Sequence, residues 1–156
     1  MSALTAWDKA KERCDFWREK QQKIVFTNGC FDLLHPGHIK YLNDAKALGD
    51  VLVVGLNADA SITGLKGDSR PINALPDRAV MLMGLKAVDM VVSFEEETPL
   101  NLIQTLLPDV LVKGGDYKAD DIVGAKEVRE HGGQVIVVPF LQGYSSSNLI
   151  NRIKAS

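Results

Sequence analysis

The sequence predicts an α/β fold, a single doubly wound Rossmann-like domain with a five-stranded parallel sheet. The prediction depends on two sequence patterns, short apolar runs and segments of helical periodicity, and on the length of the chain. Five short apolar runs alternate with segments of helical periodicity, and 156 residues suit one domain with one sizeable core. Continuous apolar runs are typical of parallel strands that are covered on both faces. We therefore expect ligands to bind at the carboxyl ends of the strands.

The strands are predicted from β-branched and aromatic residues between turn residues. The first, Lys23 to Thr27, stops at Asn28-Gly29, and the second, Val51 to Asn57, follows a helix stop at Leu48-Gly49. Three further strands are predicted by the same pattern: 89–93, 110–112 and 135–138.

Helices are predicted between these strands and at both ends of the chain. Ile39, Leu42 and Ala45 recur at helical spacing, so a helix should begin near Pro36 or Gly37. Further helices are expected over 76–85, from Thr98-Pro99 with Thr98 as a plausible cap, over 121–131, and from within 145–147 to Ile153. Residues 1–22 are expected to form an appended N-terminal helix, and residues 23–156 the main domain.

Composition limits the classes of function. The chain is 46% hydrophobic with a net charge of −2, which argues against a basic surface for nucleic acid. No apolar run approaches the ~20 residues of a membrane span, and the N-terminus lacks a signal-peptide core. We expect a cytoplasmic protein that binds neither nucleic acid nor membrane. Cys14 and Cys30 have no metal-type spacing, and Cys30 is interpreted as a small packing residue.

The stretch from Thr27 to His38 carries the clearest chemical signal. It leaves a strand, turns at Asn28-Gly29 and enters a helix, and such a helix start attracts anions through its free amides. His35 and His38 lie three residues apart, so both rings can point at one phosphate. Gly37 lets a polyanion approach the backbone. One histidine alone would more often be structural, but the pair around Pro36-Gly37 favours a phosphate site.

His35-Pro36-Gly37-His38 resembles the HxGH signature of the nucleotidyltransferases, which join a nucleoside triphosphate to a phosphorylated acceptor and release pyrophosphate. The string from Thr27 to His38 narrows the resemblance to the cytidylyltransferase-like family. From Lys23 to Ile153 the chain is most similar to its D-glycero-β-D-manno-heptose 1-phosphate adenylyltransferase branch, which occurs alone or fused to a sugar kinase. The resemblance implies ATP and a sugar 1-phosphate as substrates, and ADP-heptose for lipopolysaccharide or capsule precursors as product.

The resemblance also assigns site residues. The catalytic residues it implies are His35, His38 and Lys66, the last on a loop after the second strand. It implies a set of nucleotide-binding residues: Thr27, Asn28, Gly29, Phe31, Asp32, Gly37, Lys113, Gly115, Asp116, Tyr144, Ser145, Ser146 and Ser147. A further set could bind the acceptor or phosphate: Asn57, Asp59, Arg70 and Arg78. Arg70 could equally be a surface charge, and Arg78 corresponds to an arginine found at this place in related cytidylyltransferases. Mg²⁺ is the expected cofactor, carried by the triphosphate without a direct protein ligand.

Two loops support these assignments from chemistry alone. In Lys113 to Tyr117, two glycines permit close approach of a flat ligand, while Asp116 offers an acceptor and Tyr117 a stacking face. Ser145 to Ser147 place three hydroxyls at a helix start, where one would suffice as a cap and three also suit phosphate oxygens.

Two departures from the family pattern leave alternatives open. Ile150 stands in the place of an arginine of the adenylyltransferase form, and Phe140 in the place of an arginine of the cytidylyltransferases. The alternatives are a cytidylyltransferase acting on glycerol 3-phosphate or a related polyol phosphate, and a non-catalytic nucleotide sensor. We also expect a homo-oligomer, dimeric or larger.

Overall fold

The computed structural model describes residues 2–156, and it confirms the parallel five-stranded sheet. The strands are β1 (Ile24–Gly29), β2 (Val51–Asn57), β3 (Met90–Phe94), β4 (Val110–Gly114) and β5 (Gln134–Val138). Their order in the sheet is β3-β2-β1-β4-β5, so the chain changes direction between β1 and β4. A ligand crevice forms at such a switch point, outside the carboxyl ends of the strands.

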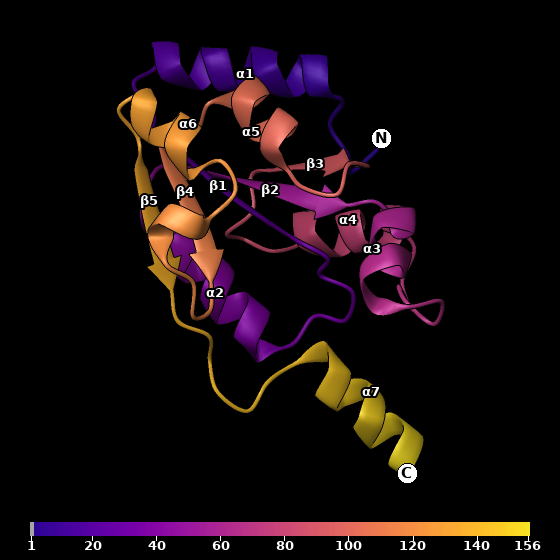
Figure 1. Ribbon diagram of the computed structural model, residues 1–156. Coiled ribbons are helices and arrows are strands. Elements are labelled where there is room, and N and C mark those ends of the chain that lie inside the picture. Colours follow the sequence, from indigo (N-terminus) through magenta and orange to yellow (C-terminus); the bar gives the residue numbers. More distant parts are fainter. Residues whose placement is uncertain (1) are drawn as a thin grey trace.

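Helices cover both faces of the sheet (Figure 1). One face packs against α1 (Trp7–Glu19), α5 (Leu100–Leu106) and α6 (Ala125–Glu130), and the other against α2 (Pro36–Lys46) and α4 (Leu75–Met83). Alternate strand residues serve the two layers, because successive side chains of a strand point to opposite faces. In β1, Ile24 and Phe26 join the first core, whereas Val25 joins the second.

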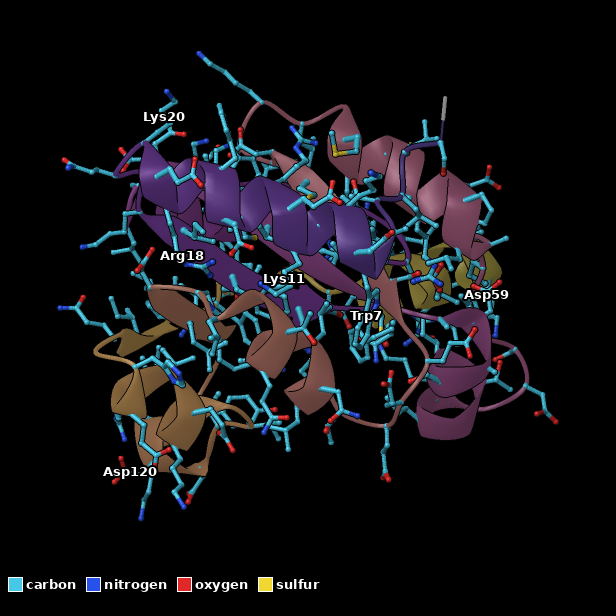
Figure 2. The ribbon with its side chains drawn as sticks, turned by 90° about the horizontal axis from the view of Figure 1, so that it is seen from above. Trp7, Lys11, Arg18, Lys20, Asp59 and Asp120 are labelled. Carbon is cyan, nitrogen blue, oxygen red and sulfur yellow. The ribbon has the colours of Figure 1, made fainter. Side chains whose placement is uncertain are left out.

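The N-terminal helix packs on the sheet and shares its core. Ala10, Cys14 and Trp17 are buried in the layer that contains α5 and α6. Nε1 of Trp7 donates to the Ser93 carbonyl at 2.8 Å, and Arg18 donates to the Leu107 carbonyl at 2.8 Å. Figure 2 shows α1 lying across the molecule, with Trp7 near one end and Lys20 near the other.

Three local predictions were wrong. The region after β2, predicted as a loop, contains a helix, α3 (Asp59–Lys66), of which only Ile62 is buried. The predicted helix over 121–131 is shorter: a 3₁₀ turn at Ala119–Asp121 precedes α6. Gly124 separates them at φ 88°, a left-handed conformation that interrupts a helix. Among the described side chains none caps α5, whose cap position is Pro99, so Thr98 does not serve as the cap.

The last helix, α7 (Ser146–Ala155), begins where the serine run predicted it. Oγ of Ser145 accepts from the Asn148 amide at 3.0 Å. All ten residues of α7 are described and none is buried. Figure 1 shows α7 away from the body of the domain, at the end of an extended segment that follows β5. Within residues 2–156, no helix combines the length and apolarity needed to cross a membrane.

Candidate active site

A cavity of about 380 Å³ lies at the carboxyl ends of β1 and β4, where the sheet topology predicts a ligand. It brings together residues from five separate parts of the chain. The predicted site residues that line it are Asn28, Gly29, Phe31, Asp32, His35, Gly37, His38, Lys66, Lys113, Tyr144, Ser145 and Ser146. Its volume lies in the range of small-molecule sites.

The two predicted catalytic histidines stack against each other at the start of α2. Their ring centroids are 3.8 Å apart, and the ring planes differ by 26°. Phe31 supports the His38 ring at 5.2 Å, and Tyr144 lies parallel to His35 at 6.2 Å. Within residues 2–156, neither buried Nδ1 atom has a hydrogen-bond partner. The pair is therefore held by ring packing rather than by hydrogen bonds from these two nitrogen atoms.

Burial keeps both rings neutral at pH 7. It lowers the pKa of His35 below its usual value. Burial, together with the nearby positive charges of His35 and Lys66, lowers the pKa of His38 from 6.5 to about 4. A neutral imidazole still donates one hydrogen bond. The rings can thus bind a phosphate oxygen as donors, without adding a full charge.

Gly37 is needed for this arrangement. A Cβ at this position would lie 2.9 Å from two atoms of the His35 ring and 3.2 Å from Cβ of Tyr144. Any larger residue would therefore displace His35. Among the described side chains none caps α2, so the positive end of this 11-residue helix faces the cavity without an internal acceptor.

Lys66 reaches the cavity from the last position of α3 rather than from a loop. It is exposed, and its charge is close enough to contribute to the low pKa of His38. A flexible exposed ammonium on the cavity rim suits a point charge for a polyanion.

Asp32 anchors the segment that follows Lys66. Its carboxylate accepts from Nε of Arg70 at 2.8 Å, and from the amides of Ile72 and Asn73 at 2.8 to 2.9 Å. Burial alone would raise the pKa of Asp32, but the amides of Asn73 and Ile72 and the Arg70 guanidinium hold it below its usual value. Arg70 is also buried, although Nη2 has no partner within residues 2–156. Asp32 thus fixes the path of the chain beyond α3.

Arg78 lies outside the cavity lining and ties three backbone segments together. Its guanidinium donates at 2.8 Å to the carbonyls of Cys30 and Asn57, and at 3.0 Å to that of Asn73. It also pairs with Asp59 at 2.6 Å. Arg78 is fully buried, which an arginine tolerates only with such partners. None of the four residues predicted to bind the acceptor or phosphate lines the cavity: Asn57, Asp59, Arg70 and Arg78.

The end of β4 lines the cavity with Lys113 and Gly114, and the following loop lines it with Tyr117, while Gly115 and Asp116 lie outside the lining. Nζ of Lys113 lies 5.6 Å from the Tyr117 ring centroid. Burial lowers the pKa of Lys113. Within the described part of the chain Lys113 forms no ion pair, so its ammonium is available for a ligand anion.

The three serines have different environments. Ser145 caps α7, and Oγ of Ser146 donates to the Leu33 carbonyl at 2.8 Å. Both line the cavity, whereas Ser147 is exposed and outside the lining. Ser146 therefore joins α7 to the loop that precedes the histidine pair.

Sequence reasoning did not assign four residues that line the cavity: Cys30, Tyr41, Phe140 and Leu141. Tyr41 follows Gly37 by four positions and His38 by three, a helical spacing that could have identified it. Its hydroxyl bonds the buried Thr27 hydroxyl and donates to the Val112 carbonyl at 3.3 Å, and burial raises the pKa of Tyr41 to about 12. Thr27, predicted to bind nucleotide, lies beneath the lining and supports Tyr41.

Fold and site together define a Rossmann-like domain with a cavity lined by paired histidines at its switch point. The Cytidylyltransferase-like family model matches residues 26–152, a span that includes every residue of the cavity lining. The chain belongs to the cytidylyltransferase-like family.

Similar proteins extend the comparison. The chain is 52% identical over 149 residues to a "Bifunctional protein HldE" of Pectobacterium atrosepticum, which covers 96% of this chain and 31% of the relative. It is 57% identical over 137 residues to a protein of the same name from Helicobacter hepaticus, which covers 88% of this chain and 28% of the relative. The chain thus spans about a third of the length of these relatives.

Two solved structures share the fold. The lipopolysaccharide core biosynthesis protein from Thermoplasma volcanium is 31% identical, with a TM-score of 0.62, and the match covers 80% of this chain and 99% of that one. Pantoate-beta-alanine ligase from Francisella tularensis is 18% identical, with a TM-score of 0.57, and covers 97% of this chain and 77% of that one. At that identity the second match supports the fold only.

Proposed function

We propose that this chain transfers the adenylyl group of ATP to D-glycero-β-D-manno-heptose 1-phosphate, forming ADP-heptose and pyrophosphate. One observation carries the proposal: the stacked histidines, Lys66 and the serines of the α7 start meet in a single cavity at the sheet switch point. Each offers hydrogen-bond donors, and two polyanionic substrates require many of them.

The reaction needs alignment more than acid–base chemistry. A phosphate oxygen of the sugar 1-phosphate is already an anionic nucleophile, and it attacks the α-phosphorus of ATP as the bond to pyrophosphate breaks. The neutral rings of His35 and His38 and the α2 amides donate to the α-phosphoryl oxygens, where charge grows in the transition state. Lys66 and the hydroxyl of Ser145, which accepts from Asn148 and keeps its proton free, donate to the β- and γ-phosphates, while Ser146 orients the start of α7 through its bond to the Leu33 carbonyl.

Mg²⁺ would enter with the triphosphate, where it neutralises charge on the departing pyrophosphate. The donor set of the cavity supports this assignment. Both oxygens of Asp32 already accept hydrogen bonds from the protein, and Asp59 is paired with Arg78. These bonds already engage both oxygens of Asp32 and one oxygen of Asp59, so we expect any contact with the ion to pass through water.

The heptose substrate is supported by the relatives. Those named HldE are bifunctional, and the branch that this sequence resembles also occurs fused to a sugar kinase. The solved relative from Thermoplasma volcanium is a lipopolysaccharide core biosynthesis protein. We infer that the chain acts in the same biosynthesis, in the cytoplasm and as a homo-oligomer.

The test is pyrophosphate release from purified protein with Mg²⁺ over four nucleotides and several phosphorylated acceptors. ATP with the β-heptose 1-phosphate should give ADP-heptose, with ATP preferred over CTP by at least about tenfold, or about 1.4 kcal/mol of transition-state binding. Equal or faster use of CTP with glycerol 3-phosphate would replace this proposal by a cytidylyltransferase. Tight ATP binding without pyrophosphate from any pair would indicate a sensor.

A further inference from the structure

The ring of Phe140 packs closely against two consecutive glycines at the end of β4, Gly114 and Gly115. A Cβ on Gly114 would be 2.6 Å from Cε1 of Phe140, and a Cβ on Gly115 would be 2.8 Å from Cε2. These atoms are on opposite edges of the ring. The ring therefore spans both glycines, and a side chain at either position would displace it.

The sheet explains this placement. Gly114 pairs with Val138 in the parallel register, and the Gly115 amide donates to the Val138 carbonyl at 3.0 Å, which extends the ladder by one residue. Phe140 follows Val138 by two residues, so an extended chain directs both side chains to the same side. Val138 is buried on the face covered by α2, and Phe140 continues that row beyond the sheet into the cavity.

Much of the Phe140 side chain is open to the cavity and to solvent. Phe140 lines the cavity, yet 66% of its surface remains exposed. Tyr117, Leu141 and Tyr144 line the same cavity and are also exposed. A large aromatic ring that is backed by rigid backbone and open toward a polar cavity has the geometry of a stacking platform.

We propose that Phe140 is the platform on which the nucleotide base stacks, and that it selects adenine over cytosine. The proposal deepens the proposed function and rests on it for the identity of the nucleotide. The two-ring adenine covers more of the Phe140 face than the single ring of cytosine, so the platform contributes more to ATP than to CTP. The donors for the α-phosphate lie on other elements, at the start of α2 and the end of α3, and the platform itself contacts only the base.

The test measures binding without acceptor, by calorimetry with ATP, CTP and inorganic tripolyphosphate, each with Mg²⁺. Phe140→Ala should weaken ATP about tenfold or more, as expected for loss of base stacking, but CTP only about threefold. Tripolyphosphate has no base, so its affinity should not change. Phe140→Trp should keep ATP binding within about threefold of the original protein, because it preserves the aromatic face.

Val80→Ala is the matched control, because Val80 is 61% exposed on α4 and outside the cavity; its binding should match the original protein. Thermal melts check the fold. If Phe140→Ala lowers the melting temperature, Phe140→Leu is the variant to measure, because leucine keeps apolar contact with the glycines but has no aromatic face. This variant should still weaken binding of ATP more than binding of CTP.

Two results would overturn the proposal. Equal losses for ATP and tripolyphosphate would show that Phe140 only positions the serine segment. Unchanged ATP binding in both the Ala and Leu variants would place the base elsewhere. A failure of the proposed function is a separate observation: the original protein would form no ADP-heptose, while these binding data would still report on Phe140.

Discussion

The two walls of the cavity are held in different ways. One wall, built from the end of β1, the start of α2 and the segment after α3, is tied by Asp32, Arg70 and Arg78, all of which are buried. Their bonds reach the backbone of Cys30, Asn57, Ile72 and Asn73. Asp32 and Arg78 each have several such partners, and because a buried charge is costly without them, this wall is held in one arrangement.

The opposite wall, residues 139–156, has fewer attachments. Its named contacts are the Ser146 bond to Leu33, the ring of Phe140 over the two glycines, and Tyr144 beside His35. The helix that follows has no buried residue. The comparison teaches a division of labour: the rigid wall preorganises donors for phosphate charge, whereas the lightly held wall can adjust around the base and the pyrophosphate.

The largest effect is expected on the rigid wall, at His38. His38→Ala should lower kcat by about 100-fold or more and alter KM for ATP much less, because charge on the α-phosphoryl oxygens grows mainly in the transition state. Steady-state pyrophosphate release measures both constants. The control is His131→Ala, which replaces an exposed histidine outside the cavity and should leave both unchanged. A near-normal kcat would return His38 to a structural role.

Lys66 allows the effect of charge on activity to be measured apart from the effect on stability, because it lies beside the rigid wall but is exposed. Lys66→Ala should lower kcat roughly 10- to 100-fold, a loss of about 1.4 to 2.7 kcal/mol, and leave the melting temperature within about 1 °C. Kinetics and a thermal melt on the same preparation test this. Lys86→Ala, an exposed lysine outside the cavity, is the control. A large loss of stability with ordinary activity would contradict the assignment.

Asp32 should show the opposite balance. Asp32→Asn removes the charge that pairs with buried Arg70, so the free energy of unfolding should fall by about 3 kcal/mol. We expect kcat to fall about tenfold, because the chain beyond Lys66 loses its anchor. Denaturant unfolding and pyrophosphate release measure the two effects. A higher KM for ATP at unchanged stability would instead support the predicted direct role of Asp32 in nucleotide binding.

The pH dependence of the same pair gives an independent check. The pKa of Asp32 in the folded protein lies below its usual 3.8, so the unfolded chain binds the proton more readily. The resulting stability is present above pH 3.8 and is lost as the pH falls through the lower folded pKa. Unfolding curves of Asp32→Asn should lack this acid-dependent component, and an identical acid profile in both proteins would contradict the assignment.

The sheet could be predicted because each strand is a continuous apolar run, whose burial on both faces leaves little choice of structure. The α3 helix could not, since it buries only Ile62 and contains Gly64, so its apolar pattern is weak. The start of α2 could be predicted because its signals, Pro36, Gly37 and the two histidines, lie within about one helical turn of each other in the sequence.

The supports of the site were not predictable in the same way. Asp32 bonds residues about 40 positions away, and Arg78 bonds a carbonyl 48 positions away. Such pairings depend on how loops meet above the sheet, and local spacing carries no record of them. Phe140 is a similar case, because its partners are the backbone of Gly114 and Gly115, which have no side chains to signal the contact.

The smallest expected effects on ATP binding are those of the serines on the lightly held wall, and they differ between Ser146 and Ser147. Ser146→Ala removes the hydroxyl that lines the cavity and bonds the Leu33 carbonyl, so KM for ATP should rise about fivefold, the worth of about 1 kcal/mol of hydrogen bonding. Ser147→Ala should stay within about twofold, because that hydroxyl lies outside the lining. Because the wall adjusts on binding, kcat should change little in either variant. A larger loss for Ser147 than for Ser146 would mean that α7 turns toward the triphosphate when ATP binds, and that the serine run acts in a conformation different from this one.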